Sequence, residues 1–104
     1  MTMIRHCVFV KFRADVPAEE RQGIYDQLAT LRDHLEGIVA MSFGPNVSPE
    51  GLHRGYADGF TIDFADAAAR DAYLVDDDHR AAGGRLVAAL EGGRDGLVVF
   101  DIAV

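Results

Sequence analysis

The spacing of apolar residues changes between two periods along the chain, and this change restricts the fold more than any other feature. In residues 4–12, apolar side chains and His6 occupy alternate positions, which is typical of a β-strand. Segments 38–43, 57–64 and 97–104 have a similar strand character. Helical spacing separates the first strand from the second and the third from the fourth. The predicted order is therefore β-α-β-β-α-β.

Residues that commonly begin and end helices delimit the two helical regions. The first region follows Pro17 and its neighbouring acidic residues, and it ends at Gly37. Its apolar positions are Ile24, Leu28, Leu31 and Leu35. In the second region, Asp66 is a good N-cap for a helix over residues 67–74. The acidic residues 76–78 interrupt this helix, and a further helix follows with Leu86, Val87 and Leu90 as its apolar positions.

This order of elements predicts an α+β, ferredoxin-like domain over residues 1–104, with helices on one side of an antiparallel four-stranded sheet. Such helices cover only one face of the sheet. We assign Cys7 and Phe9 of the first strand to the other face, together with Leu97, Val99 and Ala103 of the last strand. An uncovered apolar face of this size favours a partner. We therefore expect a homodimer in which the two sheets face each other.

Composition limits which kinds of partner the protein can bind and in which cellular compartment we expect it. The 104 residues are 49% hydrophobic and carry a formal net charge of −7, with no basic stripe, so nucleic acid is disfavoured as a partner. No apolar run is long enough to span a bilayer, and the N-terminus lacks the features of a signal peptide. The single cysteine, Cys7, excludes an intrachain disulfide. We expect a cytoplasmic protein without membrane association.

Tyr73 and His79 form the best candidate for a chemical site. Histidine can move a proton near neutral pH, and a phenol can donate a hydrogen bond to a developing oxyanion. His79 would act as the general base beside a carbonyl group, and Tyr73 as the oxyanion donor. The alternative is structural: His79 caps a helix or pairs with the preceding acids, and Tyr73 packs a helix against the sheet.

The other polar candidates have weaker patterns. His6 shares a strand face with Ile4 and Val8, so it either is a hydrogen-bonded core residue or lines a pocket. The acidic residues 76–78 and His79 resemble a ligand set, but consecutive side chains point in different directions, and we expect neither a metal site nor a cofactor. His34 and His53 lie in polar segments, and we expect both to be exposed.

Several segments together resemble the stress-responsive dimeric α/β-barrel (Dabb) family. They are residues 4–12, 44–48, 55–60 and 99–101, and the pair Tyr73 and His79. The resemblance implies a homodimeric barrel with a cavity between sheet and helices in each subunit. Tyr73 and His79 match the functional tyrosine and histidine of the family's olivetolic acid cyclase branch, and His6 matches a pocket histidine. Asp58 stands where that branch has another pocket histidine, so the resemblance makes Asp58 a ligand-binding candidate.

Three functions follow as hypotheses. The first is a small-molecule pocket protein that catalyses proton-transfer or aldol-type chemistry on a carbonyl or polyketide-like substrate, as a polyketide cyclase-like enzyme would. The second is a non-catalytic stress-responsive or ligand-binding protein. The third is a monooxygenase of the wider dimeric α/β-barrel group, which requires a haem ligand or a roomy cofactor-free pocket. His79 is the one candidate haem ligand on a helix, so this hypothesis ranks last.

Overall fold

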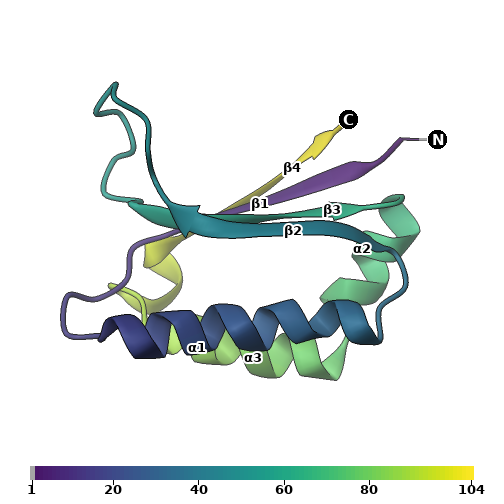
Figure 1. The fold of residues 1–104 in the computed structure, drawn as a ribbon, viewed down its shortest axis with the longest axis horizontal. Coiled ribbons are helices and arrows are strands. Elements are labelled where there is room, and N and C mark those ends of the chain that lie inside the picture. Colours follow the sequence, from purple (N-terminus) through teal and green to yellow (C-terminus); the bar gives the residue numbers. More distant parts are fainter. Residues whose placement is uncertain (1) are drawn as a thin grey trace.

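The computed structural model describes residues 2–104 as one four-stranded antiparallel sheet with its helices on a single face (Figure 1). The elements in chain order are β1 (Ile4–Val10), α1 (Ala18–Ala29), the 3₁₀ helix η1 (Thr30–Asp33), β2 (Ile38–Pro45), β3 (Asp58–Phe64), α2 (Ala67–Leu74), α3 (Asp77–Ala88), the 3₁₀ helix η2 (Gly93–Gly96) and β4 (Leu97–Ala103). The strand order is β2-β3-β1-β4. The ferredoxin-like prediction is confirmed.

The alternating pattern of β1 places its core residues against the helices. Val8 and Val10 are buried, and the register sets them opposite Phe60 and Asp58 of β3. Ile24, Leu28 and Leu31 from α1 and η1 complete this core, as their helical spacing predicts. The α-helix ends at Ala29, and a 3₁₀ turn carries the chain to Asp33, so Leu31 is buried from η1.

The pairing of β4 with β1 corrects our assignment of the β4 faces. Phe9 lies opposite Val98, and Cys7 lies opposite Phe100. Directly opposed residues point to the same side of a sheet. The outer face of β4 therefore carries Val98, Phe100 and Ile102. The residues we placed there, Leu97, Val99 and Ala103, lie on the helix side. The error arose because both alternations of β4 are rich in apolar residues, so the sequence pattern alone does not select a face.

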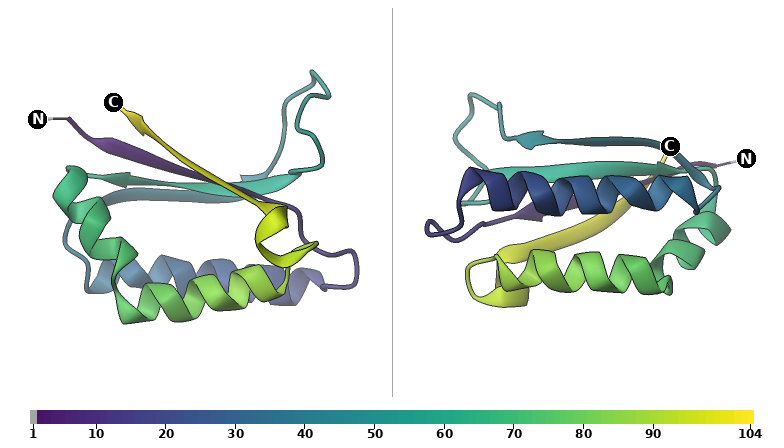
Figure 2. Two further views of the ribbon diagram at one scale, coloured as in Figure 1. Left: turned by 180° about the vertical axis from the view of Figure 1, so that it is seen from behind. Right: turned by 60° about the horizontal axis from the view of Figure 1, so that its bottom comes forward.

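A short break separates α2 from α3, as the acidic run predicts. Asp76 adopts an extended conformation, and its carboxylate accepts a hydrogen bond of 2.9 Å from the His79 amide, so it is the N-cap of α3. Figure 2 shows α2 descending steeply from the end of the sheet before the chain turns into α3. The break places His79 in the first turn of a new helix rather than in the continuation of α2.

The outer face of the sheet lacks a helical cover. The β2–β3 loop (residues 46–57) rises from this face, away from the helices (Figure 1). Phe9, Val98, Phe100 and Ile102 are exposed large apolar residues on it. None of the helices described for residues 2–104 has the length and hydropathy needed to cross a bilayer.

Candidate functional site

A cavity of about 800 Å³ lies between the sheet and α3, and it brings together three residues singled out from the sequence. His6 comes from β1, Tyr73 from α2 and His79 from α3. The volume is in the range of small-molecule sites. Its other lining residues are Val8, Leu28, Phe60, Leu74, Arg80, Gly83, Gly84, Leu86, Val87, Arg94, Leu97 and Val99.

Tyr73 and His79 are in direct contact. Their ring centroids are 3.9 Å apart with an interplanar angle of 35°. The other side of Tyr73 packs on Phe64 and His6, with centroid distances of 5.1 Å and 5.6 Å. The side chain of Tyr73 is only 1% exposed, and burial raises the pKa of its hydroxyl. The hydroxyl therefore stays protonated at neutral pH and remains a hydrogen-bond donor.

His79 is half-buried and is held in its neutral form. Burial lowers the pKa of its imidazole, and the charges of His6 and Arg80 lower it further, whereas Asp76 acts in the opposite direction. Its Nδ1 atom is buried and has no hydrogen-bond partner among residues 2–104. Its Nε2 atom faces Gly83, where a Cβ atom would lie 4.0 Å away. A neutral imidazole with an unused nitrogen is able to accept a proton.

His6 is held by a carboxylate that the sequence reasoning missed. Its Nδ1 atom lies 2.7 Å from Oδ1 of Asp101, and Arg70 donates to Oδ2 of Asp101 at 2.6 Å. Burial opposes the charge of Asp101, but the hydrogen bonds from Arg70 and His6 outweigh it and lower the pKa of Asp101. The carboxylate is therefore ionised, and it fixes the ring of His6 while leaving Nε2 for another partner. From the sequence we expect His6 either to be a hydrogen-bonded core residue or to line a pocket. In the structure it does both.

One signal in the sequence could have identified Asp101. It is the only charged residue in residues 97–104, a strand that is otherwise apolar on both faces. The register sets Asp101 directly opposite His6. A lone carboxylate in such a strand requires a partner, and a histidine in the neighbouring strand satisfies it.

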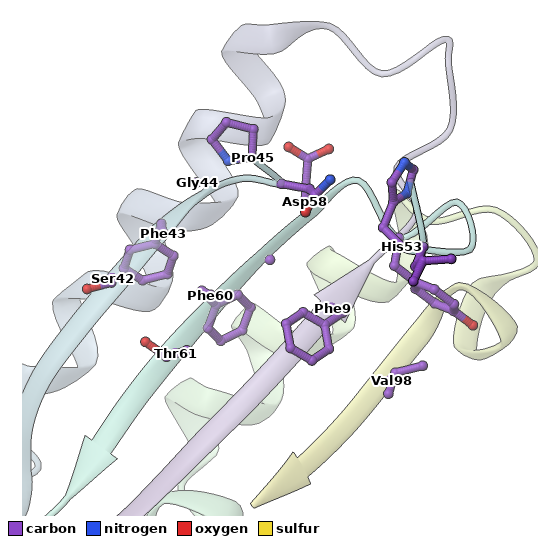
Figure 3. Close-up of a pocket in the computed structure, with 14 residues that line it drawn as sticks. Phe9, Ser42, Phe43, Gly44, Pro45, His53, Asp58, Phe60, Thr61 and Val98 are labelled. Atoms are coloured by element: carbon purple, nitrogen blue, oxygen red, sulfur yellow. The ribbon is translucent and has the colours of Figure 1, made fainter. Parts of the chain in front are cut away.

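Asp58 does not join the other three candidates. It lines a separate groove of about 570 Å³ between the sheet and the β2–β3 loop. Figure 3 shows this groove with Asp58, His53, Phe9 and Val98 around it. Oδ2 of Asp58 is 4.0 Å from a guanidinium nitrogen of Arg21. Two facing glycines, Gly44 and Gly59, leave this part of the sheet without side chains.

A second cluster of polar residues forms at the start of α3. Nε2 of His34 lies 3.0 Å from Oδ1 of Asp76 and 3.6 Å from Oδ2 of Asp78. One ligand atom from each residue falls within 4.8 Å of the others, a spacing that a metal ion could bridge. Asp76 already uses both oxygens, since Oδ2 caps the His79 amide. His34 is exposed as expected, but it is paired with acids, and it ties η1 to α3.

The fold agrees with the comparisons with known proteins. Residues 4–104 match the stress responsive A/B barrel domain, and the chain belongs to this family. A dimeric ferredoxin-like protein of unknown function from Jannaschia sp. CCS1 is 34% identical, with a TM-score of 0.91 over 98% of this chain and 99% of that chain. An Arabidopsis thaliana protein is 25% identical, with a TM-score of 0.85 over 95% of this chain and 92% of that chain.

An enzyme shares this fold at lower sequence identity. The hydroxynitrile lyase from Passiflora edulis is 15% identical, with a TM-score of 0.85 over 98% of this chain and 93% of that chain. At this identity the likeness concerns the fold alone. Comparison with curated proteins gives no match.

Proposed function

We propose that this chain is a homodimeric small-molecule-binding protein that catalyses proton transfer at a carbon next to a carbonyl group. The observation that carries the proposal is the convergence of His6, Tyr73 and His79 on one cavity of about 800 Å³. Polar groups that meet in a largely apolar cavity, two of them with shifted pKa values, are typical of a reactive site.

The proposed chemistry assigns one step to each residue. Neutral His79 takes the proton from the carbon, and its pKa below the ordinary value keeps it available as a base at neutral pH. Negative charge develops on the carbonyl oxygen, and the protonated Tyr73 hydroxyl donates a hydrogen bond to that oxygen. In an aldol-type cyclisation, the resulting carbanion then attacks a second carbonyl carbon of the same molecule. The C=O π bond at that carbon opens to an alkoxide, which takes back the proton held by His79. His6, oriented by Asp101, contacts and positions the substrate.

We propose that the outer face of the sheet packs against the same face of a second copy of the chain. Its large apolar residues are Phe9, Val98, Phe100 and Ile102, and exposure of such a face is unusual for a monomer. The 34% identical Jannaschia protein is described as dimeric. In a sheet-to-sheet dimer, the groove that contains Asp58 lies next to the interface, so the proposed ligand contact of Asp58 concerns this groove rather than the cavity.

Solvent exchange tests the chemistry without knowledge of the natural substrate. A medium-chain methyl ketone in deuterated buffer would incorporate deuterium next to its carbonyl, and NMR would follow the rate with and without protein. We expect His79→Ala to reduce the protein-dependent rate by about 10²-fold or more. Tyr73→Phe should reduce it by a smaller factor, and His53→Ala, which alters an exposed loop histidine, should leave it unchanged. A His79→Ala protein as active as the wild type would exclude His79 as the base.

A non-catalytic ligand-binding role is the second candidate, and one observation favours it. Tyr73 is almost fully buried and packs between Phe64 and His79, as a structural aromatic residue would. This role predicts that ligands bind in the cavity while deuterium exchange stays at the uncatalysed rate. The same exchange assay, paired with a binding titration, separates the two candidates.

A further inference from the structure

The charge of the cavity lining is opposite to that of the whole protein. The chain has 17 Asp and Glu residues against 10 Lys and Arg. Of the residues 2–104 that the structure describes, those lining the cavity include Arg80 and Arg94 but no Asp or Glu. A low-dielectric wall strengthens the field of such cations inside a cavity. The cavity therefore favours a negatively charged ligand although the protein as a whole is acidic.

Both arginines are available to a ligand. Arg5, Arg13, Arg21, Arg70 and Arg85 each pair with a carboxylate. By contrast, the side chains of Arg80 and Arg94 form neither an ion pair nor a hydrogen bond with any of residues 2–104. A guanidinium group that lacks a carboxylate partner is well suited to bind a carboxylate or phosphate of a ligand.

The rest of the lining is apolar and partly open. Leu74 is 44% exposed and Val99 is 48% exposed, although both line the cavity on the helix side of the sheet. Val87 and Leu97 are half-buried beside them. Covering these apolar side chains with an apolar ligand is favourable, because it removes their surface from water. The lining thus combines a long apolar wall with free cations.

The positions of the two arginines favour an elongated ligand. Arg80 lies in the first turn of α3, and Arg94 lies in η2, beyond the end of that helix at Ala88. The eight residue-to-residue steps from Arg80 to Ala88 advance about 12 Å along the helix axis. Gly83 and Gly84 lie between the arginines and present no side chain to the cavity. A ligand that lies along this glycine surface is close to His79 at one end and to η2 at the other.

We propose that the cavity binds an elongated amphipathic anion, such as a medium-chain carboxylic acid or its derivative, whose charged group is held at one end of the cavity by one of the two arginines, Arg80 or Arg94. This inference rests on the proposed small-molecule role of the cavity and names the class of ligand. The apolar part of the ligand covers Leu74, Val87 and Val99. A compact anion lacks that part, and a neutral molecule of the same shape lacks the charge.

Three probes test this selectivity by titration below their aggregation concentrations: decanoate, decanamide and acetate. We expect decanoate to bind about 10-fold or more tightly than decanamide, as a charge-assisted hydrogen bond would produce. Acetate should bind too weakly to saturate. The double variant Arg80→Gln/Arg94→Gln should bind the two decanoyl compounds equally. The matched control Arg32→Gln/Arg54→Gln removes two arginines that do not line the cavity, and it should retain the preference.

Three of the four histidines report where the probe binds. Decanoate should shift the imidazole NMR signals of His6 and His79, which line the cavity, and leave His53 unchanged. The proposal fails if the acid and the amide bind equally to the wild type, if the preference survives loss of Arg80 and Arg94, or if neither compound binds. In the wild-type protein, an acid preference without deuterium exchange would refute the chemistry and retain this inference. The His79→Ala protein keeps both arginines and should keep the acid preference.

Discussion

Asp101 lies directly opposite His6 in the β1–β4 ladder, and its carboxylate is 2.7 Å from the His6 Nδ1 atom. The same carboxylate accepts a hydrogen bond from Arg70 of α2. One residue of the last strand therefore connects the first strand, the second helix and the wall of the cavity. This arrangement makes the orientation of His6 depend on a residue 95 positions away in the sequence.

Asp101→Asn should destabilise the protein at neutral pH by about 1–3 kcal/mol, because charged hydrogen bonds to His6 and Arg70 are lost. The pKa of Asp101 is lowered in the folded state, so its contribution is complete above the pKa of the unfolded chain and is lost as the pH falls through the folded pKa. Urea unfolding at pH 7 and at pH 3 should therefore show a smaller difference from wild type at pH 3. The matched control is Asp71→Asn, an exposed partner of the same arginine; equal losses in both variants would contradict the prediction.

His79 should make the folded protein less stable in mild acid. Burial lowers its pKa, so between that value and the unfolded value of about 6.5 the unfolded chain binds more protons than the folded chain. The free energy of unfolding therefore rises with pH in this window, by at most about 1.4 kcal/mol per pH unit. Urea unfolding between pH 5 and pH 7 should show a smaller slope for His79→Gln than for the wild type. A wild-type slope in the His79→Gln protein would show that this ring does not titrate as the structure implies.

Two glycine substitutions should change stability in opposite directions. Gly84 lies inside α3, and a Cβ there meets no atom within 4 Å, so Gly84→Ala should stabilise by about 0.5–1 kcal/mol through helix propensity. At Gly37, a Cβ would overlap the side chain of Ala69, so Gly37→Ala should destabilise by about 1–3 kcal/mol. Thermal unfolding of both variants checks the signs. Destabilisation by Gly84→Ala would indicate that the helix is distorted at this position.

Phe100→Glu should convert the proposed dimer into a monomer. Phe100 is 49% exposed on the outer face and lies in the middle of its apolar residues, so a carboxylate there would be desolvated between two sheets. Sedimentation velocity or light scattering on a sizing column would measure the change in mass. Val75→Glu alters an equally apolar, exposed residue at the end of α2, on the helical side, and should leave the mass unchanged. A wild-type protein that is monomeric at micromolar concentration would contradict the proposal itself.

Local patterns in the sequence were sufficient to predict most of the fold. The alternation of residues 4–12 and the helical spacing from Ile24 to Leu31 are produced by the same burial that the structure shows, although β1 itself ends at Val10. The proximity of Tyr73 to His79 also follows from local structure, because six residues with a capped break bring α2 and α3 together. The second strand extends two residues beyond the prediction, to Pro45.

The features that the sequence did not predict depend on register between distant strands. The alignment of β4 with β1 decides which face of the sheet carries Val98 and which residue lies opposite His6. A shift of one residue would move Val98 to the other face and give His6 a different partner. Local periodicity is the same in either register. The family resemblance placed Asp58 among the pocket residues. In the structure its carboxylate lies near Arg21 of α1, and the residue lines the separate groove beside the β2–β3 loop.

Gly83 and Gly84 sit in the interior of α3, where alanine would favour the helix by about 1 kcal/mol at each position. Both glycines line the cavity, and a Cβ at either position would meet no atom closer than about 4 Å, so part of the wall beside His79 is open because side chains are missing there. Exchange of one or two residues on this helix would lengthen, shorten or close the chamber without altering the scaffold. A fold of this kind is able to acquire or lose ligands through very few genetic steps.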